Sequence, residues 1–430
     1  MNSRIHQGSL WQLVGAVLAI ASLWSAALVL AIFSLFQVLV NDQVMEAGSM
    51  SMAAAAFFLA GSLCIPSAYY ALCRLFGWQA FDSTHSQRRL QPILLILAFP
   101  AVLGLGYAAA QLERLSWILL PPIHVLAIGM PVVLVLYLAV RRLPVGSSQR
   151  VWGVFDSGLV LGPGLILVFE LAAVIAFVFL GAVVVASQPD LVDQILSLSE
   201  QFSRQTLTQE EALEVLGPFL QQPAVILAVL AFAALVVPMI EEVFKPVGAW
   251  LLVGRRMTPA EGFAAGALSG AGYALFESLM LSGGGESWMW IVLGRAGTAV
   301  LHITTSSLMG WALVQAWTHT RLFRLGLVYL GAVLVHGTWN AVVIVNAYLT
   351  LSTEWPTSLM PEGIAGWIGK AAPFILVLIT ILMLSVLFWA NRRLAAVAAR
   401  RVMEFVPANN SQDSTAMENE LEKARKEVNL

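Results

Sequence analysis

The feature that most constrains this chain is a succession of long apolar stretches with few charged residues between them. Hydrophobic residues make up 59% of the 430 positions and charged residues only 11%, a balance that leaves too little polar surface for a water-soluble domain. Because a helix needs roughly 20 apolar residues to cross a bilayer, we predict an all-α, polytopic bundle of about ten transmembrane helices. The expected spans are residues 11–40, 52–76, 91–110, 115–140, 157–187, 223–253, 259–281, 288–317, 325–349 and 370–390.

Basic residues recur in alternate loops between these spans, as in the pairs Arg141 with Arg142 and Arg255 with Arg256. Loops rich in arginine and lysine stay in the cytoplasm. With an even number of spans, both termini are then cytoplasmic, and we expect a multi-pass protein of the plasma membrane.

The apolar stretches divide the chain into five expected segments. These are N-terminal helices of unknown role (1–187), an extracytoplasmic polar segment (188–222), a core that holds most intramembrane polar residues (223–349), an outer loop with the last span (350–390) and a cytoplasmic tail (391–430). Thr208 and Glu211 form a capping-box pattern that predicts a short surface helix. Arginines after Asn391 predict a basic helix on the inner leaflet, followed by disorder beyond Pro407.

Charge and cysteine usage exclude other classes of protein. The net charge is -2 and no basic domain exists, so nucleic-acid binding is not expected. Cys64 and Cys73 lie inside or at the end of one apolar stretch. We therefore predict packing residues and neither a disulfide framework nor a cysteine metal site.

The sixth span carries three ionisable residues, Glu241, Glu242 and Lys245, and such groups are costly inside a membrane. An ion pair between Glu241 and Lys245, one turn apart, would be a purely structural arrangement, but it leaves Glu242 without a partner at the same spacing. Adjacent carboxylates in a low dielectric titrate as a coupled pair and suit acid or base work on water. We predict that both glutamates are catalytic and that Lys245 supports them.

The seventh span combines small residues with one acid. Gly262, Gly266 and Gly270 recur at every fourth position, which predicts a face for close helix packing. Glu277 follows Gly270 by two turns and shares that face. We expect its carboxylate to point into the bundle.

The eighth span carries His302 near its middle and Arg295 seven residues earlier on the same face. Arg295 and Glu277 lie at similar depth on antiparallel neighbours, so a structural ion pair between them has the same weight as a catalytic role for Glu277. The ninth span adds His336 and Asn340, one turn apart near mid-membrane. Two histidines at the depth of the paired glutamates favour function over packing.

Four short motifs on successive spans, EEVFK, FES, LHITTSS and HGTWN, resemble the PrsW family of intramembrane peptidases, relatives of the CAAX-processing and bacteriocin-processing membrane proteases. The resemblance covers residues 223–349. By position it implies catalytic roles for Glu241, Glu242, Glu277, His302, His336 and Asn340. The last motif ends in Asn, as in the CAAX branch, where PrsW proteins more often have Asp.

The resemblance implies an intramembrane endopeptidase that acts on a membrane-embedded or membrane-anchored substrate, such as a single-span regulatory protein in the bilayer. Glutamate-activated water, assisted by the histidines and by Asn340 as oxyanion donor, would cut the peptide bond. The sequence does not decide whether a divalent metal such as zinc takes part. His302, His336 and a glutamate would supply ligands, but the HExxH pattern is absent.

Two other readings stay open. Buried acids and histidines also build proton relays, so a proton- or ion-coupled transporter is the alternative, with Glu170 and His124 as further candidates. No inverted repeat supports it. A silent membrane scaffold is the third reading, and the paired glutamates argue against it.

Overall fold

A computed structural model describes residues 3–41, 43–80, 92–112, 114–186, 192, 196–197, 199–200, 222–281, 285, 287–351 and 362–405. These residues form helices and connecting turns, with no β-strand among them. The all-α prediction is confirmed. The predicted surface helix around Thr208 and the tail beyond Pro407 lie outside the described residues.

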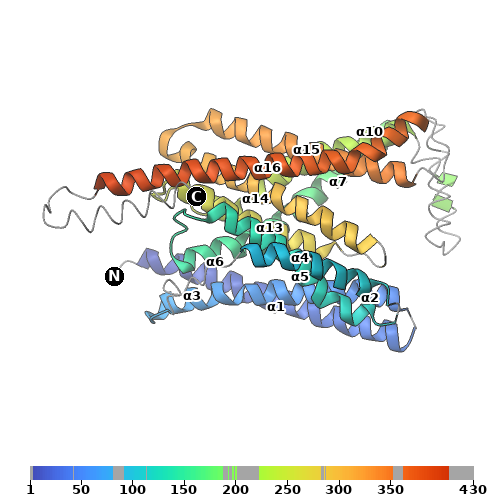
Figure 1. Cartoon of the computed structure of the whole chain (residues 1–430), viewed down its shortest axis with the longest axis horizontal. Coiled ribbons are helices and arrows are strands. Elements are labelled where there is room, and N and C mark those ends of the chain that lie inside the picture. Colours follow the sequence, from blue (N-terminus) through green and yellow to red (C-terminus); the bar gives the residue numbers. More distant parts are fainter. Residues whose placement is uncertain are drawn as a thin grey trace.

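Helices make up most of the described residues. In chain order they are α1 (Ser3–Leu39), α2 (Val44–Leu63), α3 (Ile65–Phe76), α4 (Pro92–Ala110), α5 (Ser116–Val140), α6 (Ser148–Asp156), the π-helix η2 (Ser157–Leu161), α7 (Gly162–Ala186), α10 (Pro223–Ala231), the π-helix η3 (Phe232–Val236), α11 (Val237–Phe244), α12 (Val247–Trp250), α13 (Pro259–Met280), α14 (Ser287–His319), α15 (Leu322–Leu351) and α16 (Glu362–Phe405). The start of α1 and the end of α16 lie at the same end of the bundle (Figure 1), as an even number of spans requires.

Eight stretches among the described residues are long and apolar enough to cross a membrane, and they make the chain an integral membrane protein. They are Gln7–Leu39, Glu46–Phe76, Pro92–Ala110, Ser116–Val140, Ser148–Val183, Pro223–Phe244, Leu322–Leu349 and Gly366–Arg400. The other two of the roughly ten expected spans form α13 and α14 and are less apolar. Both helices lie in the middle of the bundle (Figure 1), so they need little lipid-compatible surface.

Helix α13 is the centre of the packing. Its start is fixed by a capping box in which Thr258 and Glu261 exchange backbone and side-chain hydrogen bonds. Glu261 also pairs with Arg150 at 3.2 Å, which ties the start of α13 to α6. From there α13 contacts α14, α5 and η2. Nearly every residue of α13 is buried, so the helix can hold polar groups away from lipid.

The glycines of α13 form the predicted packing face. A Cβ at Gly266 would lie 2.0 Å from the Ser306 carbonyl oxygen, and one at Gly262 would lie 2.6 Å from the Gly310 carbonyl oxygen. Only residues without a side chain allow α14 to approach this closely. The prediction from the glycine spacing is therefore confirmed.

Gly266→Ala is expected to lower the free energy of unfolding by about 1–3 kcal/mol, the usual cost of overpacking a core. The reason is that the new methyl group meets backbone, which cannot rotate away. Gly104→Ala is the matched control, because a Cβ there meets nothing within 4 Å. Unfolding of the purified protein in mixed micelles with increasing dodecyl sulfate would measure both. Equal effects of the two changes would contradict the close α13–α14 contact.

Two expectations from the sequence are modified by the structure. The basic segment after Asn391 is helical as predicted, but it continues the last span without a break in α16. Cys64 and Cys73 are buried and free, as predicted. Cys64 also lies 2.8 Å from the Asp156 carboxylate, so it has a polar partner besides its packing role.

Candidate active site

Residues of α11 form one side of a buried polar cluster. The π-helix η3 runs directly into α11, and Pro238, which has no N–H, leaves a carbonyl oxygen of the preceding turn without its helix hydrogen bond. Glu241 and Glu242 are both buried, and Lys245 stands at the helix end with no exposed side-chain surface. The sixth expected span thus ends in a short helix whose charged residues face protein.

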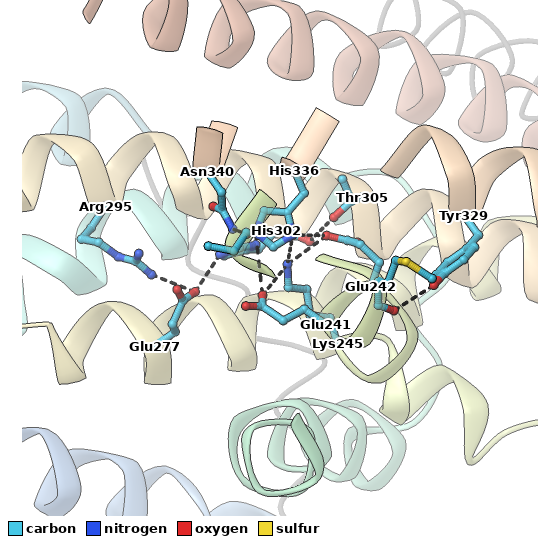
Figure 2. A network of polar contacts seen from close by, with 12 residues as sticks. Glu241, Glu242, Lys245, Glu277, Arg295, His302, Thr305, Tyr329, His336 and Asn340 are labelled. Carbon is cyan, nitrogen blue, oxygen red and sulfur yellow. Dashed lines mark hydrogen bonds and ion pairs between the residues drawn. The ribbon is translucent and has the colours of Figure 1, made fainter. Parts of the chain in front are cut away.

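Lys245 lies between the two glutamates. Its Nζ is 2.9 Å from Glu241 Oε2 and 2.9 Å from Glu242 Oε1, so the structural ion pair exists but involves both acids. The same ammonium lies 3.1 Å from Nδ1 of His336 and 5.2 Å from the ring centroid of Tyr273. Lys245 therefore compensates charge at the centre of the cluster (Figure 2).

Glu277 on α13 joins a second ion pair to the cluster. Its Oε2 lies 2.8 Å from Nη2 of Arg295 and 2.7 Å from Nε2 of His302. The Arg295 pair expected from helix depth is thus present, and the same carboxylate also orients a histidine (Figure 2). Because a carboxylate only accepts, the proton of neutral His302 resides on Nε2, and Nδ1 keeps a lone pair.

Helix α15 contributes His336. Its Nδ1 lies 3.0 Å from Glu242 Oε1, and its Nε2 lies 3.9 Å from Glu241 Oε2. Nδ1 can either accept from the Lys245 ammonium or donate to Glu242, and in the second tautomer a lone pair stays on Nε2 toward Glu241. The rings of His302 and His336 are 5.4 Å apart, edge to face. The two histidines predicted from separate spans therefore meet at one point.

Asn340 lies one turn after His336 and contacts the π-helix. Its Nδ2 donates a hydrogen bond of 2.9 Å to the carbonyl oxygen of Ala233, a residue within η3. Gly337 allows this approach, because a Cβ there would lie 2.1 Å from the Ala234 carbonyl oxygen. One amide hydrogen of Asn340 is thus used to join α15 to η3.

Tyr273 belongs to the cluster and was missed by sequence reasoning. It is buried, precedes Glu277 by one turn on α13, and its hydroxyl makes a hydrogen bond with Glu241. Its ring packs edge to face on His302 at 5.2 Å. The i,i+4 spacing from Glu277 on the glycine-rich helix was the available signal.

The candidates for a transporter relay are separated by the fold. His124 on α5 accepts a hydrogen bond of 3.2 Å from Nε1 of Trp288, and Trp288 belongs to the hydrophobic core. Glu170 on α7 interacts electrostatically with Glu241 and Lys245, so it belongs to the surroundings of the cluster. No chain of acids and histidines links the two among the described residues.

The cluster contains a possible metal site. One ligand atom each from Glu241, His302 and His336 lie within 4.8 Å of one another, and all three residues are buried. His302 Nδ1 has no hydrogen-bond partner, as a vacant ligand atom requires. Glu277 behind His302 and Glu242 behind His336 match the carboxylate–histidine arrangement that orients metal ligands. This donor set therefore fits a divalent cation such as zinc.

The balance of charges in the cluster also favours a bound cation. Glu241, Glu242 and Glu277 supply three carboxylates, whereas Lys245 and Arg295 supply two cationic groups. With neutral histidines, one negative charge stays uncompensated in a medium of low dielectric. Lys245 contacts one oxygen of the Glu241 carboxylate, so metal and ammonium would share this carboxylate.

Comparison with known proteins gives one match. Residues 165–361 match the model of the PrsW family intramembrane metalloproteases. The match is wider than the predicted 223–349 and takes in most of α7, which packs against α11 through stacked Phe169 and Phe244 rings 4.7 Å apart. No curated protein and no solved structure matches the chain. Residues 165–361 are thus a segment of the PrsW intramembrane protease type.

Proposed function

We propose that Glu241, His302 and His336 form the hydrolytic centre of this intramembrane endopeptidase. One observation carries the proposal: three polar side chains from three separate helices converge within 4.8 Å in the buried centre of a membrane protein. Such a cluster is costly in a bilayer unless it does chemistry. The substrate is a protein in the same bilayer, and we propose single-span membrane proteins as its class.

Glu241 acts as the general base in this proposal. Water held between its carboxylate and the two histidines loses a proton to Glu241, and the hydroxide attacks the carbonyl carbon of the scissile bond. The proton then passes to the amide nitrogen, the C–N bond breaks, and a carboxylate and an amine leave. Glu277 holds His302 at 2.7 Å, and Glu242 holds His336 at 3.0 Å, so both rings are fixed before substrate binds.

A divalent metal held by Glu241, His302 and His336 would polarise the water and the substrate carbonyl. The chain's own residues keep their tasks: Glu277 and Glu242 orient the rings, and Lys245 offsets one of the two charges of the paired glutamates. Asn340 has a second amide hydrogen besides the one given to Ala233. We propose it as a donor to the developing oxyanion.

Removal of metal provides the first test. We expect a membrane-permeant chelator to reduce peptide cleavage by the wild-type protein at least tenfold, and added zinc to restore it. Zinc content should fall in His302→Ala and His336→Ala, measured by plasma mass spectrometry on purified protein. Full cleavage by protein that contains no metal would contradict the metal role and leave Glu241 as the only activator.

Tyr273 is proposed as a catalytic donor beside Glu241. Tyr273→Phe keeps the ring packing on His302 but removes the hydroxyl, so we expect kcat to fall roughly ten- to a hundredfold with KM changed little. Tyr329→Phe is the matched control: it removes a hydroxyl that binds the Met239 carbonyl at 2.8 Å and that interacts electrostatically with Glu242 instead of Glu241. Equal kcat values for Tyr273→Phe and wild type would exclude Tyr273 from the reaction.

A further inference from the structure

A large cavity lies beside the first half of α1 and is lined by other residues than the protease centre; α1 begins at the same end of the bundle as α16 ends (Figure 1). The volume of the cavity is about 1630 Å³, and it is lined by α1, α3, α6, η2, the first turns of α7 and the segment that follows α12. None of the clustered catalytic candidates lines it. Most of its walls come from residues before 165, outside the family match.

One rim of the cavity is basic. Arg74, Arg150, Arg255 and Arg256 line it, and Arg150 is paired with Glu261. Among the described residues, no carboxylate lies within ion-pair distance of the other three, which are exposed. The positive-inside rule places these arginines at the cytoplasmic membrane surface. The rim therefore presents unpaired guanidinium groups where anionic lipids are found.

One stretch of the cavity wall is apolar and contains glycines, whereas Gln12, Gln149 and Asp156 line another part. Leu18, Leu161 and Leu165 line the apolar stretch together with Gly15 and Gly164. A Cβ at either glycine would meet nothing within 4 Å, so the space beside them is open. An apolar recess beneath a basic rim has the polarity of a phospholipid, with its phosphate above and its acyl chains below.

We propose that this cavity binds one phospholipid with an anionic headgroup. The arginines of the rim bind the phosphate, for which guanidinium groups are suited by their paired N–H donors. The acyl chains lie along α1 and the start of α7. This inference is independent of the proteolytic mechanism, because it uses none of the same residues.

The test measures phosphatidylglycerol binding to the full-length purified protein by native mass spectrometry. Wild type is expected to retain phosphatidylglycerol in preference to phosphatidylcholine by at least tenfold. Arg255→Gln combined with Arg256→Gln should weaken binding about fivefold for each arginine removed. The matched control is Arg392→Gln combined with Arg393→Gln, an adjacent exposed pair on α16 outside the cavity, which should leave binding unchanged.

A second pair of variants tests the apolar recess. Gly15→Leu fills the space along α1 and should reduce phosphatidylglycerol binding at least tenfold, whereas Gly104→Leu, in open surroundings on α4, should not. Excess inorganic phosphate serves as the competitor that separates a lipid from a free anion. The proposal is overturned if phosphate displaces the lipid completely, if phosphatidylcholine binds equally well, or if variants and controls behave alike.

Discussion

Glu241→Gln is expected to lower the rate of peptide-bond cleavage at least a hundredfold, with the protein still folded. A positioned general base contributes roughly 10²- to 10⁴-fold, and glutamine cannot accept the proton of water. Glutamine has nearly the same shape and keeps an oxygen for the Tyr273 hydroxyl, which contacts Glu241. The change therefore separates the carboxylate charge, which serves both proton transfer and metal binding in the proposal, from packing.

The measurement is the initial rate at which a single-span substrate is cleaved in liposomes that contain equal amounts of wild-type or variant protein. Glu46→Gln is the control, because Glu46 is exposed near the start of α2 and accepts a hydrogen bond of 3.0 Å from Gln37, away from the cluster. A Glu241→Gln rate within threefold of wild type would exclude Glu241 as the base. Glu242 would then become the candidate, since it lies 3.0 Å from His336.

Lys245→Met is expected to destabilise the protein by about 3–5 kcal/mol, the cost of leaving a buried charge without its partner. Lys245 is fully buried and contacts two carboxylates at 2.9 Å, so its loss leaves adjacent acids with no cation between them. Methionine fills a similar length, which keeps the cavity term small. Unfolding in mixed micelles with dodecyl sulfate measures the change.

The double variant Lys245→Met with Glu242→Gln provides the control for this charge argument. Removal of one of the two unpaired acids should recover part of the lost stability, and the difference between single and double variants gives the coupling free energy. Additive losses would show that Lys245 acts through packing. In that case the glutamates would have to be compensated by another group.

Most of the helices and most of the clustered polar residues could be predicted from the sequence, because a lipid environment restricts which residues a helix can expose. Spans reveal themselves by length and polarity, and the glycines at 262, 266 and 270 marked a contact face that the structure places against Ser306 and Gly310. Glu277 and Arg295 were expected to share a depth, and together with His302 they form one chain of ion pairs. Residues that are expensive in a membrane are visible in the sequence because apolar residues surround them.

Other features depend on three-dimensional detail that no spacing encodes. The π-helix at 232–236 adds a residue to one turn and turns the Ala233 carbonyl toward Asn340, so this asparagine has a packing partner that its motif does not indicate. Tyr273 was missed because an aromatic residue is ordinary in an apolar helix. Its significance comes from the Glu241 and His302 contacts, which join neighbours distant in sequence.

The most direct test of the account is cleavage of a panel of single-span proteins by the purified wild type in liposomes made with H₂¹⁸O, followed by mass spectrometry of the fragments. We predict a cut at a membrane-embedded peptide bond, with ¹⁸O in the new carboxylate, and neither product with Glu241→Gln or His336→Ala. If wild type leaves every substrate intact while the same two substitutions abolish a pH-dependent flux across the liposomes, the cluster is a transport site and the hydrolytic centre proposed above is wrong.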